Sequence, residues 1–404
     1  MGYSSTYLER RIAVSQHPGL HDGPIYLDYN ATTPVDPFVV GAMLPYLSQH
    51  FGNPSSSHAY GHVTKQAIKT AREQVAQLLQ CKPSEVVFTG GGSESDTLAI
   101  RGIALTRRER GNHIITQVTE HPAVLNACRA LERLHGFRVT YLPVDNYGQV
   151  RLADVEAALD DQTVLVTIMH ANNETGTLQP IAEIAELAHK HGALVHTDAS
   201  QSVGKILTHI EDVGVDLLTV AGHKLYAPKG IGALYVRKGL VLEPAIYGGG
   251  QEQGRRAGTE NIAFMVGLGA ACMLAREQLP TSQPRLQHLR DALQAQLEQH
   301  LSGTVHLNGH PTQRLPNTLN VSIDGVIGEE VLATTPKIAS STGSACHEGN
   351  TDPSDVLMAM GMSRERALSA LRLTLGRWST EAEVERASAA IAEAALRLRQ
   401  RLYA

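Results

Sequence analysis

Two side chains with distinctive chemistry follow apolar stretches that have the composition of buried strands. Asp198 follows the run Ala193–His196, and Lys224 follows Leu217–Val220 after a short turn. A carboxylate at such a position can hold a protonated pyridine nitrogen in a buried ion pair. A buried lysine has a lowered pKa, which frees its amine to form a Schiff base. Each residue also has an ordinary alternative, because Asp198 could cap the next helix and Lys224 could be a solvated surface charge.

A glycine-rich turn could supply a third part of the same chemistry. The segment Phe88–Asp96 reads Phe-Thr-Gly-Gly-Gly-Ser-Glu-Ser-Asp and opens a helical pattern. Glycines allow a sharp turn close to a ligand, and free N–H groups at a helix start favour a phosphate. The alternative is a tight turn with Ser93 as the N-cap and Asp96 completing a capping box. Taken together, the carboxylate, the lysine and this turn predict a pyridoxal phosphate site.

The elements that must position these side chains alternate along the chain. Between about Pro34 and Arg276, short apolar runs rich in β-branched residues are separated by amphipathic stretches. This alternation predicts a three-layer α/β/α sandwich, in which helices cover both faces of a mostly parallel sheet. Ligands of open α/β sheets bind at the carboxyl ends of the strands. The functional side chains are therefore expected just after strands.

The composition changes near the middle of the C-terminal half. Pro280–Pro284 predicts a break, followed by a polar helix over Arg285–His300. An alternating strand pattern and two further helical patterns then predict a smaller α+β domain. We expect residues 34–280 to form a large cofactor-binding domain, and residues 1–33 to join 281–404 in the small one.

The overall composition excludes several classes of protein. The chain has 404 residues, of which 42% are hydrophobic and 19% charged, as in ordinary globular proteins. Its formal charge of -5 gives no basic field for nucleic acid or anionic membranes. The longest apolar run, Ile262–Ala275, is too short to span a membrane, and residues 1–23 lack the apolar block of a secretory signal. Four widely spaced cysteines favour a reducing compartment, so we expect a cytoplasmic location.

Many separate motifs together give the chain a specific resemblance to one enzyme family. The chain resembles the cysteine desulfurases of the housekeeping and nitrogen-fixation branch, which are class V aminotransferase-like, fold-type I pyridoxal phosphate enzymes. The motifs are Tyr26–Pro34, Gly52–Ser56, Thr119–His121, Asn172–Gly176, Asp198–Gln201, Gly222–Lys224, Arg256–Thr259, Ser344–Cys346 and Leu371–Arg377. The resemblance implies a homodimer that converts L-cysteine to L-alanine and passes the sulfur on.

By this resemblance, five residues are expected to handle the ring of pyridoxal 5'-phosphate. Lys224 would form the Schiff base, and Asp198 would pair with the pyridine nitrogen. His121 would stack on the ring and move protons. Asn173 and Gln201 would hydrogen-bond the phenolic oxygen, and Asn173 would also contact the substrate.

The resemblance assigns a second group of residues to the phosphate and the substrate. Gly92, Ser93 and His223 would hold the phosphate, with Thr259 reaching in from the second subunit. Arg372 would bind the substrate carboxylate through its planar guanidinium group.

One position departs from the family pattern. The family usually has serine two residues before the histidine of the His-Lys pair, whereas this sequence has Ala221. A hydrogen bond to the phosphate worth about 1.5–3 kcal/mol is therefore lost or replaced by water. We expect an effect on cofactor affinity and none on cofactor identity.

Cys346 is the residue that selects an activity. Most cysteines are inert and buried, which is our interpretation of Cys81, Cys128 and Cys272. Cys346 instead lies in the polar, small-residue stretch Ser340–Ser354, a composition suited to a mobile loop that exposes a nucleophilic thiol. We expect it to accept sulfur as a persulfide. The sulfur would pass to an acceptor protein in iron–sulfur cluster assembly or another thiolation pathway, DNA backbone sulfuration included, and that acceptor could carry an iron–sulfur cluster.

Three alternatives stay open at this point. A selenocysteine lyase would share the site but would not depend on Cys346, because selenium leaves more readily than sulfur. A non-catalytic paralogue would act as a binding partner in a sulfur pathway. A metal hydrolase would draw on the 19 histidines, although no ligand set such as H-E-x-x-H occurs.

Overall fold

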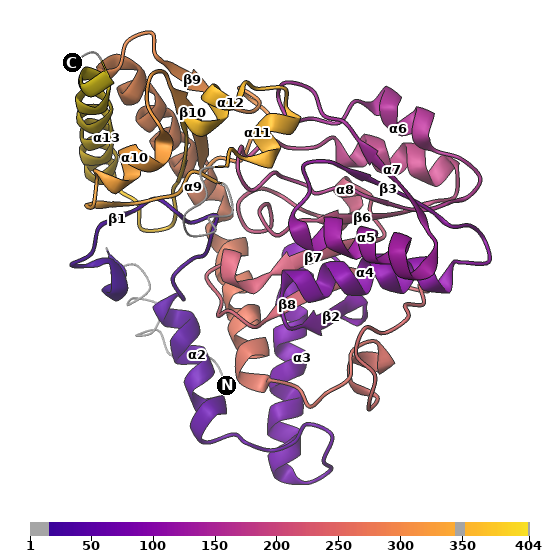
Figure 1. Ribbon diagram of the computed structural model, residues 1–404. Helices are drawn as coiled ribbons and strands as arrows, with labels where there is room; N and C mark the ends of the chain where they lie inside the picture. Colours follow the sequence, from indigo (N-terminus) through magenta and orange to yellow (C-terminus); the bar gives the residue numbers. More distant parts are fainter. Residues whose placement is uncertain (1–15, 344–351, 403–404) are drawn as a thin grey trace.

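The computed structural model describes residues 16–343 and 352–402, and its central feature is a seven-stranded sheet (Figure 1). The strand order is β2-β8-β7-β6-β5-β3-β4. β8 runs antiparallel to β2 and β7, and the other neighbours are parallel. The strands are β2 (Val86–Thr89), β3 (His113–Gln117), β4 (Arg138–Leu142), β5 (Thr163–Thr167), β6 (Leu194–Asp198), β7 (Leu217–Ala221) and β8 (Gly232–Val236).

Helices cover both faces of this sheet, so the predicted three-layer α/β/α sandwich is confirmed. On one face, α4 (Gly92–Thr106) and α5 (Pro122–His135) contribute Leu98 and Leu131 to a buried apolar cluster. On the other face lie α2 (Pro37–Ser48), α3 (Ala59–Leu79) and α7 (Ile181–Lys190), with Ile68 among their buried side chains. The remaining helices of this part are the short α6 (Leu152–Ala158) and α8 (Ile210–Val213).

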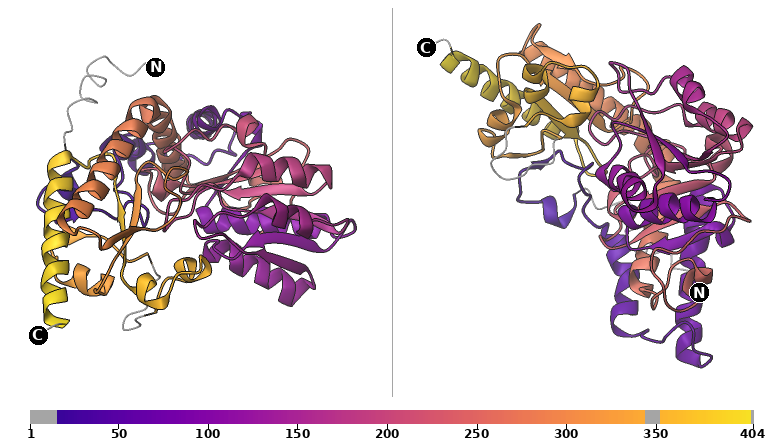
Figure 2. Two further views of the ribbon diagram at one scale, coloured as in Figure 1. Left: turned by 90° about the horizontal axis from the view of Figure 1, so that it is seen from above. Right: turned by 45° about the vertical axis from the view of Figure 1, so that its right-hand side comes forward.

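The C-terminal part of the chain has its own sheet and its own apolar core. β9 (Val305–Leu307), β10 (Thr318–Ile323) and β12 (Ala370–Thr374) form an antiparallel sheet in the order β12-β10-β9. Its helices are α10 (Gly328–Ala333), α11 (Asp355–Ala359), α12 (Arg364–Leu368) and α13 (Glu381–Leu402). The left view of Figure 2 shows these orange and yellow elements on one side of the molecule and the purple and magenta sheet on the other.

The N-terminal segment associates with this C-terminal part. β1 (Ile25–Tyr26) pairs in parallel with β11 (Ile338–Ala339). Leu27, which follows β1, is fully buried in the same apolar cluster as Leu371 and Val384. This pairing brings Asp28 and Asn30 to the junction between the two sheets.

One long helix, α9 (Ile262–His300), joins the two cores, so the break predicted at Pro280–Pro284 is wrong. A proline removes one intrahelical hydrogen bond and clashes with the preceding turn. Packing on both sides compensates here, because Leu274 belongs to the core beneath the main sheet and Leu289 to the C-terminal core. Among the described residues, only α9 is long and apolar enough to cross a membrane. Of its most apolar stretch of 18 residues, 61% is buried within the protein.

Candidate active site

A cleft of about 390 Å³ lies at the carboxyl ends of β6 and β7. Nine of the eleven predicted site residues line it. They are Gly92, Ser93, His121, Asn173, Asp198, Gln201, His223, Lys224 and Arg372. The cleft is also lined by residues that the sequence did not assign to the site, among them Asn30, Asp96 and Ser200.

Lys224 ends a single 3-10 turn, η3 (Gly222–Lys224), directly after β7. Its Nζ donates to the backbone oxygens of Asn30 at 2.5 Å and Ala31 at 2.7 Å. Burial and, to a smaller extent, the Arg372 charge lower the pKa of Lys224 to about 8, although the Asp198 charge opposes the shift. A substantial fraction of the amine is therefore neutral near pH 7.5, which is the form that attacks an aldehyde.

Asp198 is the last residue of β6 and is buried beside a second carboxyl group. Its Oδ1 accepts a hydrogen bond from the Ser200 backbone N–H at 2.9 Å. Burial and the Asp198 charge raise the pKa of the neighbouring Asp96 well above its usual value. This shift favours the neutral form of Asp96. The carboxyl group of Asp198 lines the cleft and can pair with a protonated ring nitrogen.

His121 is the N-cap of α5, because its Nδ1 accepts a hydrogen bond from the Ala123 backbone N–H at 3.1 Å. Burial lowers the pKa of His121; the Asp198 charge opposes this shift and the Lys224 charge adds to it. The neutral ring, with Nδ1 as acceptor, carries its proton on Nε2. Nε2–H is thus the atom through which His121 can exchange a proton.

Ser93 is the second residue of α4 rather than its N-cap, so the capping-box interpretation of this turn is wrong. The helix begins at Gly92, and the N-cap is Gly91, whose φ of +147° lies in a region that L side chains rarely adopt. A Cβ added at Gly92 would lie 3.2 Å from Ser200 Oγ and 3.3 Å from the Ala221 Cβ. Small residues therefore surround the first turn of the helix and let a ligand approach its backbone N–H groups.

His223 and Arg372 lie at two further sides of the cleft. Burial, together with the Lys224 charge, lowers the pKa of His223 to about 4, and its Nδ1 is 3.2 Å from Thr32 Oγ1. Arg372, in β12, donates from Nη2 to Asp28 Oδ1 at 2.9 Å. A neutral imidazole and an arginine fork are thus available for polar groups of a ligand. The site fits pyridoxal phosphate, because it offers a reactive amine, a partner for the ring nitrogen and a helix N-terminus for the phosphate.

One predicted site residue that the structure describes, Thr259, does not line the cleft. Thr259 is exposed in the segment between η4 (Gln251–Gly254) and α9. Cys346 lies outside the described residues. The other three cysteines are free: Cys128 and Cys272 are fully buried, and Cys81 is half-buried.

Glu174 is a further residue that the sequence did not single out. Its Oε2 accepts a hydrogen bond from Ser354 Oγ at 2.5 Å and would lie 3.0 Å from a Cβ at Gly343. Burial raises the pKa of Glu174 to about 7, and the hydrogen bond from Ser354 and the Arg372 charge oppose the rise. Glu174 thus binds Ser354 and lies next to Gly343, on the two sides of residues 344–351.

Residues 25–387 match the class V aminotransferase family, and the chain belongs to it. The family uses pyridoxal phosphate, so the fold and cofactor predicted from the sequence are confirmed. The chain is 48% identical over 377 residues to a cysteine desulfurase of Nostoc sp., with 93% of this chain and 94% of that protein covered. A solved NifS-like protein superposes with a TM-score of 0.86 at 37% identity, covering 92% of this chain and 98% of that one. A structure of SspA in complex with cysteine matches at 40% identity and a TM-score of 0.76, over 88% and 100%.

Proposed function

We propose that this protein is a cysteine desulfurase, which converts L-cysteine to L-alanine and transfers the sulfur to Cys346 as a persulfide. The observation that carries the proposal is one cleft that combines the amine of Lys224, the carboxylate of Asp198 and the guanidinium of Arg372. Relatives named cysteine desulfurase, and a structural neighbour that holds cysteine, support the same substrate.

Pyridoxal phosphate, when bound, withdraws electrons from the Cα of an attached amino acid. The chain's own groups do the rest. Asp198 keeps the ring nitrogen protonated, and Arg372 holds the substrate carboxylate. Lys224 accepts the Cα proton on Nζ, and His121 exchanges a proton with the substrate thiol.

The sulfur transfer is assigned to Cys346. Its thiolate attacks the substrate sulfur and forms the S–S bond, while the substrate Cβ–S bond breaks and its electron pair goes to carbon. Protonation of that carbon gives alanine, and the persulfide remains on Cys346. A sulfur-acceptor protein then removes the outer sulfur, as in iron–sulfur cluster assembly or another thiolation pathway.

We propose a homodimer, in which Thr259 of each subunit binds the phosphate of the cofactor held by the other subunit. Exposed apolar side chains on α2, on the start of α3 and in the segment between them support a second copy as the partner. These side chains are Val40, Leu44, Leu47, Phe51, Tyr60 and Val63, of which Phe51 is 76% exposed. The exposed position of Thr259, away from its own cleft, fits contribution across a subunit boundary.

We also propose a cytoplasmic location and the domain division 34–280 and 1–33 with 281–404. The two separate apolar cores and the β1–β11 pairing support the division, while α9 spans its boundary.

The decisive experiment compares the wild type with the C346S variant, both loaded with pyridoxal phosphate. The wild type should release alanine from cysteine under a reductant, whereas C346S should keep the yellow cofactor and release none. Undiminished turnover by C346S would remove the sulfur-accepting role from Cys346. A selenocysteine lyase would be indicated if C346S retained activity on selenocysteine alone.

A further inference from the structure

Lys205 is a buried lysine that the mechanism above does not use. It follows β6 by seven residues in the turn that begins at Asp198, and only 9% of its surface is exposed. Its Nζ donates to two amide oxygens, Gln201 Oε1 at 2.9 Å and Asn30 Oδ1 at 3.0 Å. Long side chains of this type are seldom fully buried without a specific partner, so this arrangement needs a reason.

The two amides that Lys205 contacts are fixed in one orientation. Gln201 turns its oxygen toward Lys205 and donates from Nε2 to the backbone oxygen of Asn30 at 2.9 Å. A carbonyl oxygen accepts only, and a lysine Nζ offers at least two N–H donors whether or not it is protonated. The contacts on both sides therefore agree on the same orientation of the Gln201 carboxamide. The second hydrogen on Nε2 is left for a ligand in the cleft that Gln201 lines.

The same network reaches the other groups of the site. Asn30 Oδ1 also accepts from Asn317 Nδ2 at 3.1 Å, and Asn30 Nδ2 donates to the backbone oxygen of Asn173 at 3.2 Å. The backbone oxygen of Asn30 further accepts from Lys224 Nζ at 2.5 Å. Lys205 is thus hydrogen-bonded directly to Gln201. It is linked to the Lys224 amine through Asn30, which accepts a hydrogen bond from each lysine.

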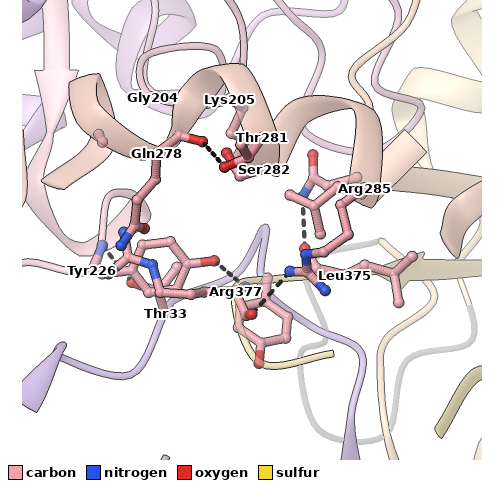
Figure 3. A pocket seen from close by; sticks show the side chains of 14 residues that line it. Thr33, Gly204, Lys205, Tyr226, Gln278, Thr281, Ser282, Arg285, Leu375 and Arg377 are labelled. Atoms are coloured by element: carbon pink, nitrogen blue, oxygen red, sulfur yellow. Dashed lines mark hydrogen bonds between the residues drawn. The ribbon is translucent and has the colours of Figure 1, made fainter. Parts of the chain in front are cut away.

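Among the residues that the structure describes, the charged groups that act on Lys205 are cations. Burial lowers its pKa well below the usual value, and the charges of Lys224 and Arg372 add to this. On its far side, Lys205 lines a second cavity of about 300 Å³ together with Arg285 and Arg377 (Figure 3). An ion pair therefore does not explain its place, whereas its two donated hydrogen bonds do.

We propose that Lys205 is a positioning residue, which holds the Gln201 carboxamide with its amino group toward the phenolic oxygen of the bound cofactor. The proposal rests on the function proposed above. Without Lys205, Gln201 Oε1 and Asn30 Oδ1 each lose a buried donor, and the Gln201 carboxamide is free to turn. The cofactor would then lose a fixed hydrogen bond at the oxygen whose charge shapes its visible absorption band.

The test is a double-mutant cycle with K205M, Q201L and the combined variant. The dissociation constant of pyridoxal phosphate and the visible spectrum of the loaded protein are measured for each. K205M should raise the dissociation constant about tenfold, as expected for one lost buried hydrogen bond. It should also shift the visible band in the same direction as Q201L, and the combined variant should show no further shift.

The control is K190M, which removes an exposed lysine of α7 that pairs with Glu186, and it should leave both quantities unchanged. A folded K205M with normal affinity and a normal spectrum overturns the proposal, and so do strictly additive spectral shifts. Should K205M be insoluble, K205Q retains an NH2 group that can donate, on a shorter side chain. It should give a smaller change in the same direction, whereas a wild-type spectrum overturns the proposal. Failure of the proposed function would appear separately, as a wild type that releases no alanine from cysteine.

Discussion

Arg372 Nη2 and Asp28 Oδ1 lie 2.9 Å apart, although 344 residues separate them in the sequence. The pair joins β12, in the three-stranded sheet, to the segment after β1. Arg372 Nη1 also donates to the backbone oxygen of Asn173 at 3.3 Å. The guanidinium plane is therefore fixed before a substrate arrives. A fixed fork lowers the entropy cost of binding a carboxylate.

R372K is expected to raise the KM for cysteine by about ten- to a hundredfold, with a smaller change in kcat. A lysine keeps the charge but lacks the planar pair of donors, so about 1.5–3 kcal/mol of charge-assisted binding is lost. Steady-state alanine release at varied cysteine concentration measures both constants. An unchanged KM would mean that the substrate carboxylate binds elsewhere.

The rate at which the apoprotein incorporates pyridoxal phosphate should rise with pH and level off above about 8. Burial lowers the pKa of Lys224 to about 8, and only the neutral amine attacks the aldehyde. Below that value the reactive fraction falls about tenfold per pH unit. Growth of the visible band after rapid mixing gives the rate, and K224A serves as the control that forms no covalent link. A rate that does not vary between pH 6 and 8 would contradict the assigned role of Lys224.

A221S is expected to slow loss of the cofactor about tenfold. Ala221 lies against the first turn of α4, and a hydroxyl there adds one hydrogen bond to a phosphate bound at that turn. S200A should have the opposite effect, because Ser200 Oγ lies on the same side of Gly92. Release of pyridoxal phosphate after dilution, followed by absorbance, tests both variants. Equal release rates in all three proteins would place the phosphate away from this turn.

The stability of E174Q relative to the wild type should increase with pH. Burial raises the pKa of Glu174 from 4.5 to about 7, so the folded state holds a proton that the unfolded chain has lost. The stability that this group contributes is complete below pH 4.5 and is lost as the pH rises through 7, which amounts to about 3 kcal/mol. Glutamine does not titrate. Urea unfolding at pH 5 and pH 8 should show this difference, and the exposed-site variant E186Q should follow the wild type.

The positions of Asp198 and Lys224 could be predicted from the sequence because both follow apolar strands. Parallel neighbours end at one edge of a sheet, so two residues at strand ends meet there. The antiparallel direction of β8 was not predictable in this way, because Gly232–Val236 has the same apolar composition as its parallel neighbours.

The burial of Lys205 and Glu174 had no local signal in the sequence. The partners of Lys205 include Asn30, 175 residues away, and the partner of Glu174 is Ser354, 180 residues away. Such contacts depend on how the two cores meet, which local periodicity does not encode. The continuous helix across Pro280 and Pro284 escaped prediction for the same reason, because packing outweighed the local preference of proline.

The 39 residues of α9 form a rod about 60 Å long that both cores share. Unfolding of either core would expose the leucines at one end of α9 to solvent. The loss of packing would destabilise the helix, and with it the other core that packs on the same helix. Heating in a calorimeter should therefore give a single endotherm for the whole subunit instead of two.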